Sequence, residues 1–188
     1  MLPDIIETQR LMIRRFTLDD LHDVHRILDV DLKIYDLTLD QRAEWLHWSV
    51  LNYAQLAALH QPPYGDRAVV LKETNQLIGV VGLVPMLEPY DQLPYFNANP
   101  SPNAPFRPEV GLYYAFDPAF QRQGYATEAV TGLIDCAFEV LHLQRIIATT
   151  EYTNELSQAM MRRLGMTLTA NPFPEPFWFQ IVGTLENK

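Results

Sequence analysis

The sequence of 188 residues contains a single cysteine, which excludes an intramolecular disulfide and any zinc site built from cysteines. Cys136 falls in the middle of an expected helix among apolar neighbours, so we interpret it as a core residue and not as a nucleophile. No stretch approaches the roughly 18–20 consecutive apolar residues of a membrane span. We therefore predict a protein with no metal centre and no membrane association.

Positive charge is also scarce, with 14 Lys and Arg against 23 Asp and Glu and a net charge of −9. General nucleic-acid binding needs a basic footprint, so the composition argues against it. The excess of acid favours solubility and would suit a cationic partner. The opening segment, residues 1–10, carries acidic residues and no apolar signal core, so we expect a cytoplasmic protein.

Hydrophobic periodicity predicts one globular domain over residues 1–188, of a mixed-sheet α/β class. Helix starts are marked by capping-box spacing at Thr17 with Asp20 and at Thr38 with Gln41. The expected elements are a strand at 10–16, helices after Thr17 and Thr38, a hairpin of 67–72 and 77–84, a strand at 109–116, a helix at 127–141, a strand at 145–152, a helix from Asn154 to Gly165, and a strand at 177–185.

Residues 85–108 interrupt this pattern with seven prolines and three asparagines. Proline removes a backbone donor and fixes φ, so neither a helix nor a central strand fits this composition. We predict a surface loop, unusually long for a compact domain and hence functional or disordered.

The last helix is expected to bury an apolar face made of Leu156, Ala159, Met160 and Leu164.

The junction FDPAFQRQGYATEAV, residues 116–130, links a strand to a helix through a polar turn with one glycine. A helix N-terminus offers unpaired N–H groups and a partial positive charge, and Gly124 would let an anion approach closely. The turn lacks the Gly-Lys-Ser/Thr ending of an NTPase P-loop and the three glycines of a dinucleotide fingerprint. Both an ordinary turn and a phosphate cradle remain open on these residues alone.

The run from Gln121 to Ala126 resembles the Gln/Arg-x-x-Gly-x-Gly/Ala signature of the GNAT superfamily of acyl-CoA-dependent N-acetyltransferases. The segments ETQRLMIRRFTLDD, IGVVGL, EVGLYYAFDPAFQRQGYATEAV and TNELSQAMMRRLGM are similar, in that order, to its RimJ/RimL-like branch. That branch acetylates the N-terminal amines of proteins, including ribosomal-protein alanine residues. The resemblance covers nearly the whole chain.

The resemblance implies the GNAT fold, with a mixed sheet flanked by helices and a splayed fourth and fifth strand. It implies acetyl-CoA as co-substrate, with the pantetheine arm between those strands, and an amine acceptor entering near the first two helices. The monomer and the homodimer both remain possible. The implied cofactor-binding residues are Phe116, Gln121, Arg122, Gln123, Gly124, Tyr125, Ala126, Thr127, Asn154 and Ser157.

The implied reaction is direct attack of a neutral amine on the thioester. Glu109 and Glu151 are the candidate bases, each with the alternative of an exposed carboxylate at a strand end. Ser157 is the candidate hydrogen-bond donor to the departing sulfur and not a full proton donor, because a serine hydroxyl is a far weaker acid than a thiol. The alternative for Ser157 is a serine that simply favours the first turn of a helix. Met161 stands where many relatives have a tyrosine, so the sequence does not supply the tyrosine acid of those relatives. A small-molecule N-acetyltransferase and a CoA-binding sensor without turnover are the alternatives.

Overall fold

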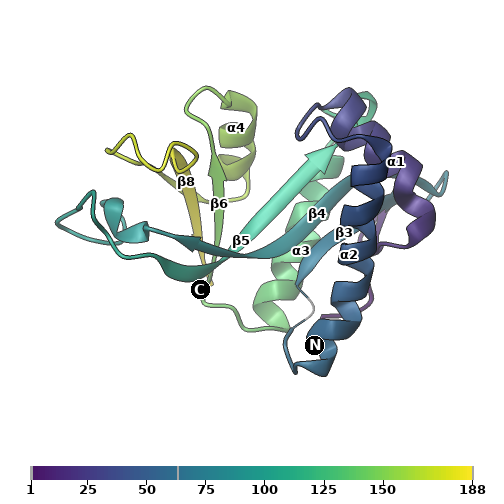
Figure 1. Ribbon diagram of the computed structural model, residues 1–188, viewed down its shortest axis with the longest axis horizontal. Coiled ribbons are helices and arrows are strands. Elements are labelled where there is room, and N and C mark those ends of the chain that lie inside the picture. The colour runs from purple at the N-terminus through teal and green to yellow at the C-terminus, as the bar shows by residue number, and fades with distance from the viewer. Residues whose placement is uncertain (1, 63, 188) are drawn as a thin grey trace. The chain divides into compact units, whose positions relative to one another are not determined.

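The structure of the protein is a computed structural model that describes residues 2–62 and 64–187 (Figure 1). The chain divides into two compact units. The first contains the residues up to Leu83 together with Tyr113–His142, and the second contains Val84–Leu112 together with the residues from Leu143 onward.

Along the described residues the expected strands and helices occur in the predicted order, with the short strands Ile5–Glu7 and Thr167–Ala170 in addition. In chain order they are β1 (Ile5–Glu7), β2 (Leu11–Arg15), the 3₁₀ turn η1 (Leu18–Asp20), α1 (Leu21–His25), the π turn η2 (Arg26–Asp31), α2 (Leu39–Ala58), β3 (Gly65–Leu71), β4 (Gln76–Glu88), η3 (Tyr90–Gln92), β5 (Arg107–Phe116), η4 (Pro118–Phe120), α3 (Tyr125–Glu139), β6 (Arg145–Thr150), α4 (Glu155–Arg163), β7 (Thr167–Ala170) and β8 (Ile181–Glu186).

In the first unit, β1, β2, β3 and β4 lie side by side in that order, each antiparallel to its neighbour. β3 and β4 form the predicted hairpin, although β4 continues past the predicted end of its strand to Glu88. Asn75, in the connecting turn, has a φ of 55°, a left-handed conformation that asparagine tolerates.

Side-chain alternation gives this sheet two covered faces. Ala68 and Val70 point to one face and join a buried cluster with Val24 and Leu46 of the first two helices. On the other face α3 approaches so closely that a Cβ on Gly132 would contact Ile6, Thr8 and Ile13. The structure thus places α1 and α2 on one face and α3 on the opposite face, as Figure 1 also shows.

The two predicted capping boxes are confirmed. The Asp20 carboxylate accepts the N–H of Thr17 at 2.8 Å. At the start of α2, the Thr38 hydroxyl accepts the N–H of Gln41 at 3.3 Å, and the Gln41 side chain accepts the N–H of Thr38 at 2.9 Å. Each box satisfies backbone donors that lack partners within the helix.

In the second unit the strand order is β5, β6, β8 and β7. β5 pairs with β6 in parallel, with Gly111 opposite Ile147, whereas β8 is antiparallel to both of its neighbours. The sheet is therefore mixed, as predicted. Its core contains Tyr90, Leu93, Ile147, Phe179 and Val182.

The prediction of a surface loop at 85–108 is only partly correct. Its first four residues complete β4, and Tyr90 and Leu93 are fully buried in the second core. The last helix also differs from prediction, because Leu156 is 72% exposed and the buried pair is Met160 and Met161.

The last strand begins at Ile181 rather than at residue 177, after a bend in which Phe177 and Trp178 are exposed. β1 and β7 were not predicted, because strands of three and four residues give too short an alternation to recognise.

No helix among the described residues is long and apolar enough to cross a membrane.

Candidate active site

The junction after β5 is a 3₁₀ turn, a tight loop and the first turn of α3. Gly124 occupies the position before α3 with a φ of +83°, and Arg122, two residues earlier, has a φ of 60°. Only glycine adopts such angles without steric cost, so the local chemistry selects glycine at 124. The loop residues from Gln121 to Gly124 are exposed.

This geometry can receive an anion. α3 is fifteen residues long, and the backbone N–H groups of Tyr125 and Ala126 lie in its first turn, where no intrahelical acceptor exists. The helix dipole adds roughly half a positive charge at this end. The absence of a Cβ at Gly124 leaves the backbone open to a phosphate.

The two glutamines of the loop bind the loop itself. Gln121 donates its side-chain amide to the carbonyl of Phe116 at 3.0 Å, and Gln123 donates to the carbonyl of Ala119 at 3.1 Å. Both side chains therefore shape the turn.

Arg10 braces the same turn from the start of β2. Its guanidinium donates to the carbonyl of Gln123 at 3.1 Å and to the carboxylate of Glu128 at 2.6 Å, and its Cζ lies 4.3 Å from the ring centre of Tyr125. Glu128 also accepts the hydroxyl of Thr8 at 2.6 Å. Although burial alone would raise it, these hydrogen bonds hold the pKa of Glu128 below its ordinary value.

Asp117 fixes the other end of the turn. One carboxylate oxygen caps η4 by accepting the N–H of Ala119 at 2.8 Å, and the other accepts Arg26 at 2.8 Å. A shallow cavity of about 530 Å³ lies beside this ion pair. Sequence reasoning missed Asp117, although an aspartate directly before a proline and a short helical turn is a cap signal.

The second unit holds the remaining candidates at the start of α4. The Asn154 side chain accepts the N–H of Ser157 at 3.0 Å, so Asn154 is the predicted N-cap. Ser157 is half-buried in the first turn, and Met161, one turn later, is buried. Gly165 ends the helix region with a φ of +83°, as predicted. Glu151 is exposed, and its backbone carbonyl accepts the Gln158 side chain.

Glu109 is not the simple exposed carboxylate of the alternative interpretation. It forms an ion pair with Arg145 at 3.2 Å, and its side chain is only 14% exposed. Burial raises the pKa of Glu109, and the guanidinium groups of Arg145 and Arg107 offset part of that rise. A carboxylate with a raised pKa is a stronger base, so this environment is compatible with proton acceptance.

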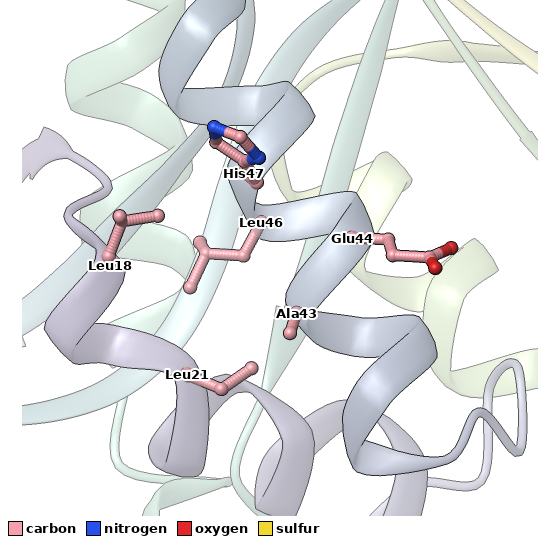
Figure 2. Close-up of a pocket in the computed structure, with 6 residues that line it drawn as sticks. All are labelled: Leu18, Leu21, Ala43, Glu44, Leu46 and His47. Carbon is pink, nitrogen blue, oxygen red and sulfur yellow. The ribbon is translucent and has the colours of Figure 1, made fainter.

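Residues of η1, α1 and α2 line an open apolar pocket of about 430 Å³ (Figure 2). Leu18, Leu21, Ala43 and Leu46 face this space, whereas Glu44 points away from it. Two aromatic residues of α2 pack in the core of the first unit and do not line this pocket. Tyr53 is buried in the core, and Trp45 packs edge-on against Phe16 at 5.7 Å between ring centres.

The sequence profile described as "Acetyltransferase (GNAT) domain" matches residues 10–167. The chain belongs to this family. The match contains the braced turn with Gly124, so the junction that can receive an anion belongs to the GNAT domain. The chain is accordingly an acetyltransferase.

Relatives and solved structures agree with the GNAT assignment. The uncharacterized N-acetyltransferase YnaD of Bacillus subtilis is 28% identical over 166 residues, which cover 86% of this chain and 81% of that protein. A ribosomal-protein-S5-alanine acetyltransferase from Vibrio fischeri superposes with a TM-score of 0.66 at 17% identity, over 98% of this chain and 97% of that one. RimL, a ribosomal L7/L12 α-N-protein acetyltransferase in complex with coenzyme A, superposes with a TM-score of 0.63 at 15% identity, over 96% of this chain and 95% of that one. At these identities the structures show a shared fold.

Proposed function

We propose that this GNAT enzyme transfers the acetyl group of acetyl-CoA to the N-terminal α-amine of a protein or peptide, in the manner of the RimJ/RimL branch. The observation that carries the proposal is the left-handed Gly124 at the head of α3, in a turn held by Arg10 and Asp117. The order of the sequence motifs and the ribosomal-protein acetyltransferases among the structures of the same fold support the choice of acceptor.

In this proposal the turn binds the pyrophosphate of the co-substrate. The backbone N–H groups at the start of α3 supply neutral donors, and the exposed Arg122 supplies a positive charge. The backbone of Phe116 holds the pantetheine arm. The full proposed set is Phe116, Gln121, Arg122, Gln123, Gly124, Tyr125, Ala126 and Thr127 in the first unit, and Asn154 and Ser157 in the second.

Holding the two substrates together and aligned accounts for much of the proposed acceleration. A backbone N–H near Ala115 and Phe116 would stabilise the negative charge that develops on the thioester oxygen. An α-amine titrates near ~8, so a useful fraction is neutral at physiological pH, and Glu109 or Glu151 accepts the proton directly or through water. Ser157 donates a hydrogen bond to the departing thiolate.

Two measurements test the proposal in sequence. Acetyl-CoA should raise the melting temperature of the wild type and should raise it much less for Gly124→Trp. Asp135→Asn, at an exposed position of α3, serves as a control that leaves the turn intact. Absence of a shift in the wild type would refute acetyl-CoA binding. Release of free thiol with an amine then separates an enzyme from a sensor that binds CoA without turnover.

The acceptor is identified by intact mass. Peptides that differ in their first residue are incubated beside free amino acids and polyamines with acetyl-CoA. The proposal expects addition of one acetyl group to peptide α-amines. Acetylation confined to the small molecules would replace the protein acceptor with the small-molecule alternative.

A further inference from the structure

Asp66 is a half-buried residue on the face of the first sheet that α1 and α2 cover, and its carboxylate oxygen Oδ1 is buried. It is the second residue of β3 and pairs with Gly82 of β4. By alternation it points to the same face as Ala68 and Val70, which lie in the cluster beneath the helices. A Cβ added to Gly82 would collide with the Asp66 carboxylate, so the carboxylate lies over Gly82.

No residue that the structure describes donates a hydrogen bond to the buried Oδ1 of Asp66. The donors around it are committed elsewhere. The Tyr53 hydroxyl donates to the backbone carbonyl of Asp66, and Arg42 donates to both carboxylate oxygens of Asp29 at 2.8 and 2.7 Å. A buried carboxylate without donors is costly, so its retention calls for a reason.

The hydroxyl of Tyr113 on β5 is the second buried polar group here without a well-formed hydrogen bond among the described residues. Its electrostatic neighbours are Asp66, Arg42 and Tyr35, and the Tyr35 side chain also makes a weaker hydrogen-bonding contact with it. Tyr113 and Asp66 are therefore two oxygen acceptors in the same region. Tyr35 is 55% exposed, so this neighbour of Tyr113 is in contact with solvent.

We infer that Asp66 and the Tyr113 hydroxyl bind a positively charged group of the acceptor, a second cation beyond the amine that receives the acetyl group. An ammonium has donors and no acceptor, so it complements the carboxylate oxygen that lacks a donor and the phenol oxygen that can still accept a hydrogen bond. The ring of Tyr35 already attracts one cation here, because the Arg42 guanidinium carbon lies 5.5 Å from its centre. A neutral group would leave the ionised carboxylate uncompensated.

The spacing along β5 fits this role, which rests on the proposed transfer near Ala115. Tyr113 and Ala115 lie two residues apart and point to the same face. A strand rises about 3.3 Å per residue, so the two positions are separated by about 7 Å. An acceptor would thus carry its second charge a short carbon chain away from the reacting amine, as a diamine does or a peptide with a basic residue near its start.

Matched acceptor pairs test the inference. Cadaverine is compared with pentylamine, and a peptide with lysine at its second position is compared with the same peptide carrying norleucine. We expect the wild type to favour the charged member of at least one pair by about tenfold or more in kcat/KM. The two pairs distinguish a small amine from a peptide as the source of the charge.

Asp66→Asn should bring the charged-to-neutral ratio close to one, and Tyr113→Phe should lower it in part. Glu44→Gln, which removes an exposed negative charge from α2, should keep the wild-type ratio. A wild type without preference, or an Asp66→Asn variant that keeps the preference, would overturn the inference.

Direct binding separates this inference from the proposed function. Cadaverine without acetyl-CoA should raise the melting temperature of the wild type more than that of Asp66→Asn. If no amine is acetylated but this difference appears, the proposed activity fails and the cation site stands. If amines are acetylated and the difference and the preference are both absent, the cation site fails alone.

Discussion

Replacing Asp66 with asparagine should stabilise the protein at neutral pH, because the native fold holds the ionised carboxylate in an unfavourable place. Burial raises the pKa of Asp66 from 3.8 to about 6, and Arg42 opposes only part of that rise. Asparagine has a similar shape and no charge to desolvate. The variant therefore removes the electrostatic cost while keeping the packing over Gly82.

The magnitude follows from the pKa difference between folded and unfolded chains. A difference of about two pKa units corresponds to about 3 kcal/mol, taken as an upper bound. The folded carboxyl has the higher pKa, so it retains its proton while the unfolded one loses it. The free energy of unfolding of the wild type therefore falls as the pH rises from about 4 to about 6, and the full cost remains above that window.

The assay is urea or thermal unfolding of wild type and Asp66→Asn between pH 4 and pH 8. The free energy of unfolding of the variant should exceed that of the wild type by up to about 3 kcal/mol at pH 8 and by about half of that at pH 5. At pH 4 the two values should be nearly equal. For a chain of this size the gain corresponds to roughly 6–12 °C in melting temperature. Glu44→Gln serves as the exposed control. A stability difference that is constant across this range, or a less stable variant at pH 8, would refute the reasoning.

Three further substitutions test other parts of the structure. Arg42→Met should lower the free energy of unfolding by about 3–5 kcal/mol in urea titrations. The side chains of Asp29 and Arg42 are each 1% exposed, so the substitution leaves Asp29 buried without the guanidinium of Arg42. A loss below about 1 kcal/mol would contradict a buried ion pair. Tyr90→Phe should raise stability by about 1 kcal/mol, since the buried hydroxyl has no partner among the described residues; destabilisation would reveal a hidden partner. Gly124→Val should lower the free energy of unfolding by about 1–2 kcal/mol, because residue 124 has a positive φ. The same variant should also bind acetyl-CoA more weakly in calorimetry. Asn75→Ala, at another position of positive φ, should lose stability and keep the wild-type affinity for acetyl-CoA.

Local chemistry explains what the sequence predicted well. The capping boxes at Thr17 and Thr38 involve residues three positions apart, so their pattern is visible in a single stretch of sequence. Gly124 is similar, because the need for a left-handed residue before α3 is a property of the turn itself. The order of elements followed from such signals together with the periodicity.

The environments of the titratable groups could not be predicted in this way. Glu109 appeared to be a strand-end carboxylate, yet Arg145, which lies 36 positions later in the chain, pairs with it. Nothing in the turn before β3 indicates that Asp66 lies beneath a helix. Tyr90 sits in a proline-rich segment whose composition predicted exposure, whereas the core around Phe179 buries it. Tertiary contacts decide all three cases.

The brace at the candidate cofactor turn has a consequence for how the protein is made. Thr8 and Arg10 precede their partner Glu128 by 120 and 118 positions, so they are synthesised well before it. Closing so large a loop costs entropy before any contact compensates for it. We therefore expect the proposed co-substrate turn to become ordered only after Glu128 has left the ribosome, so that a nascent chain that ends before Glu128 does not bind acetyl-CoA.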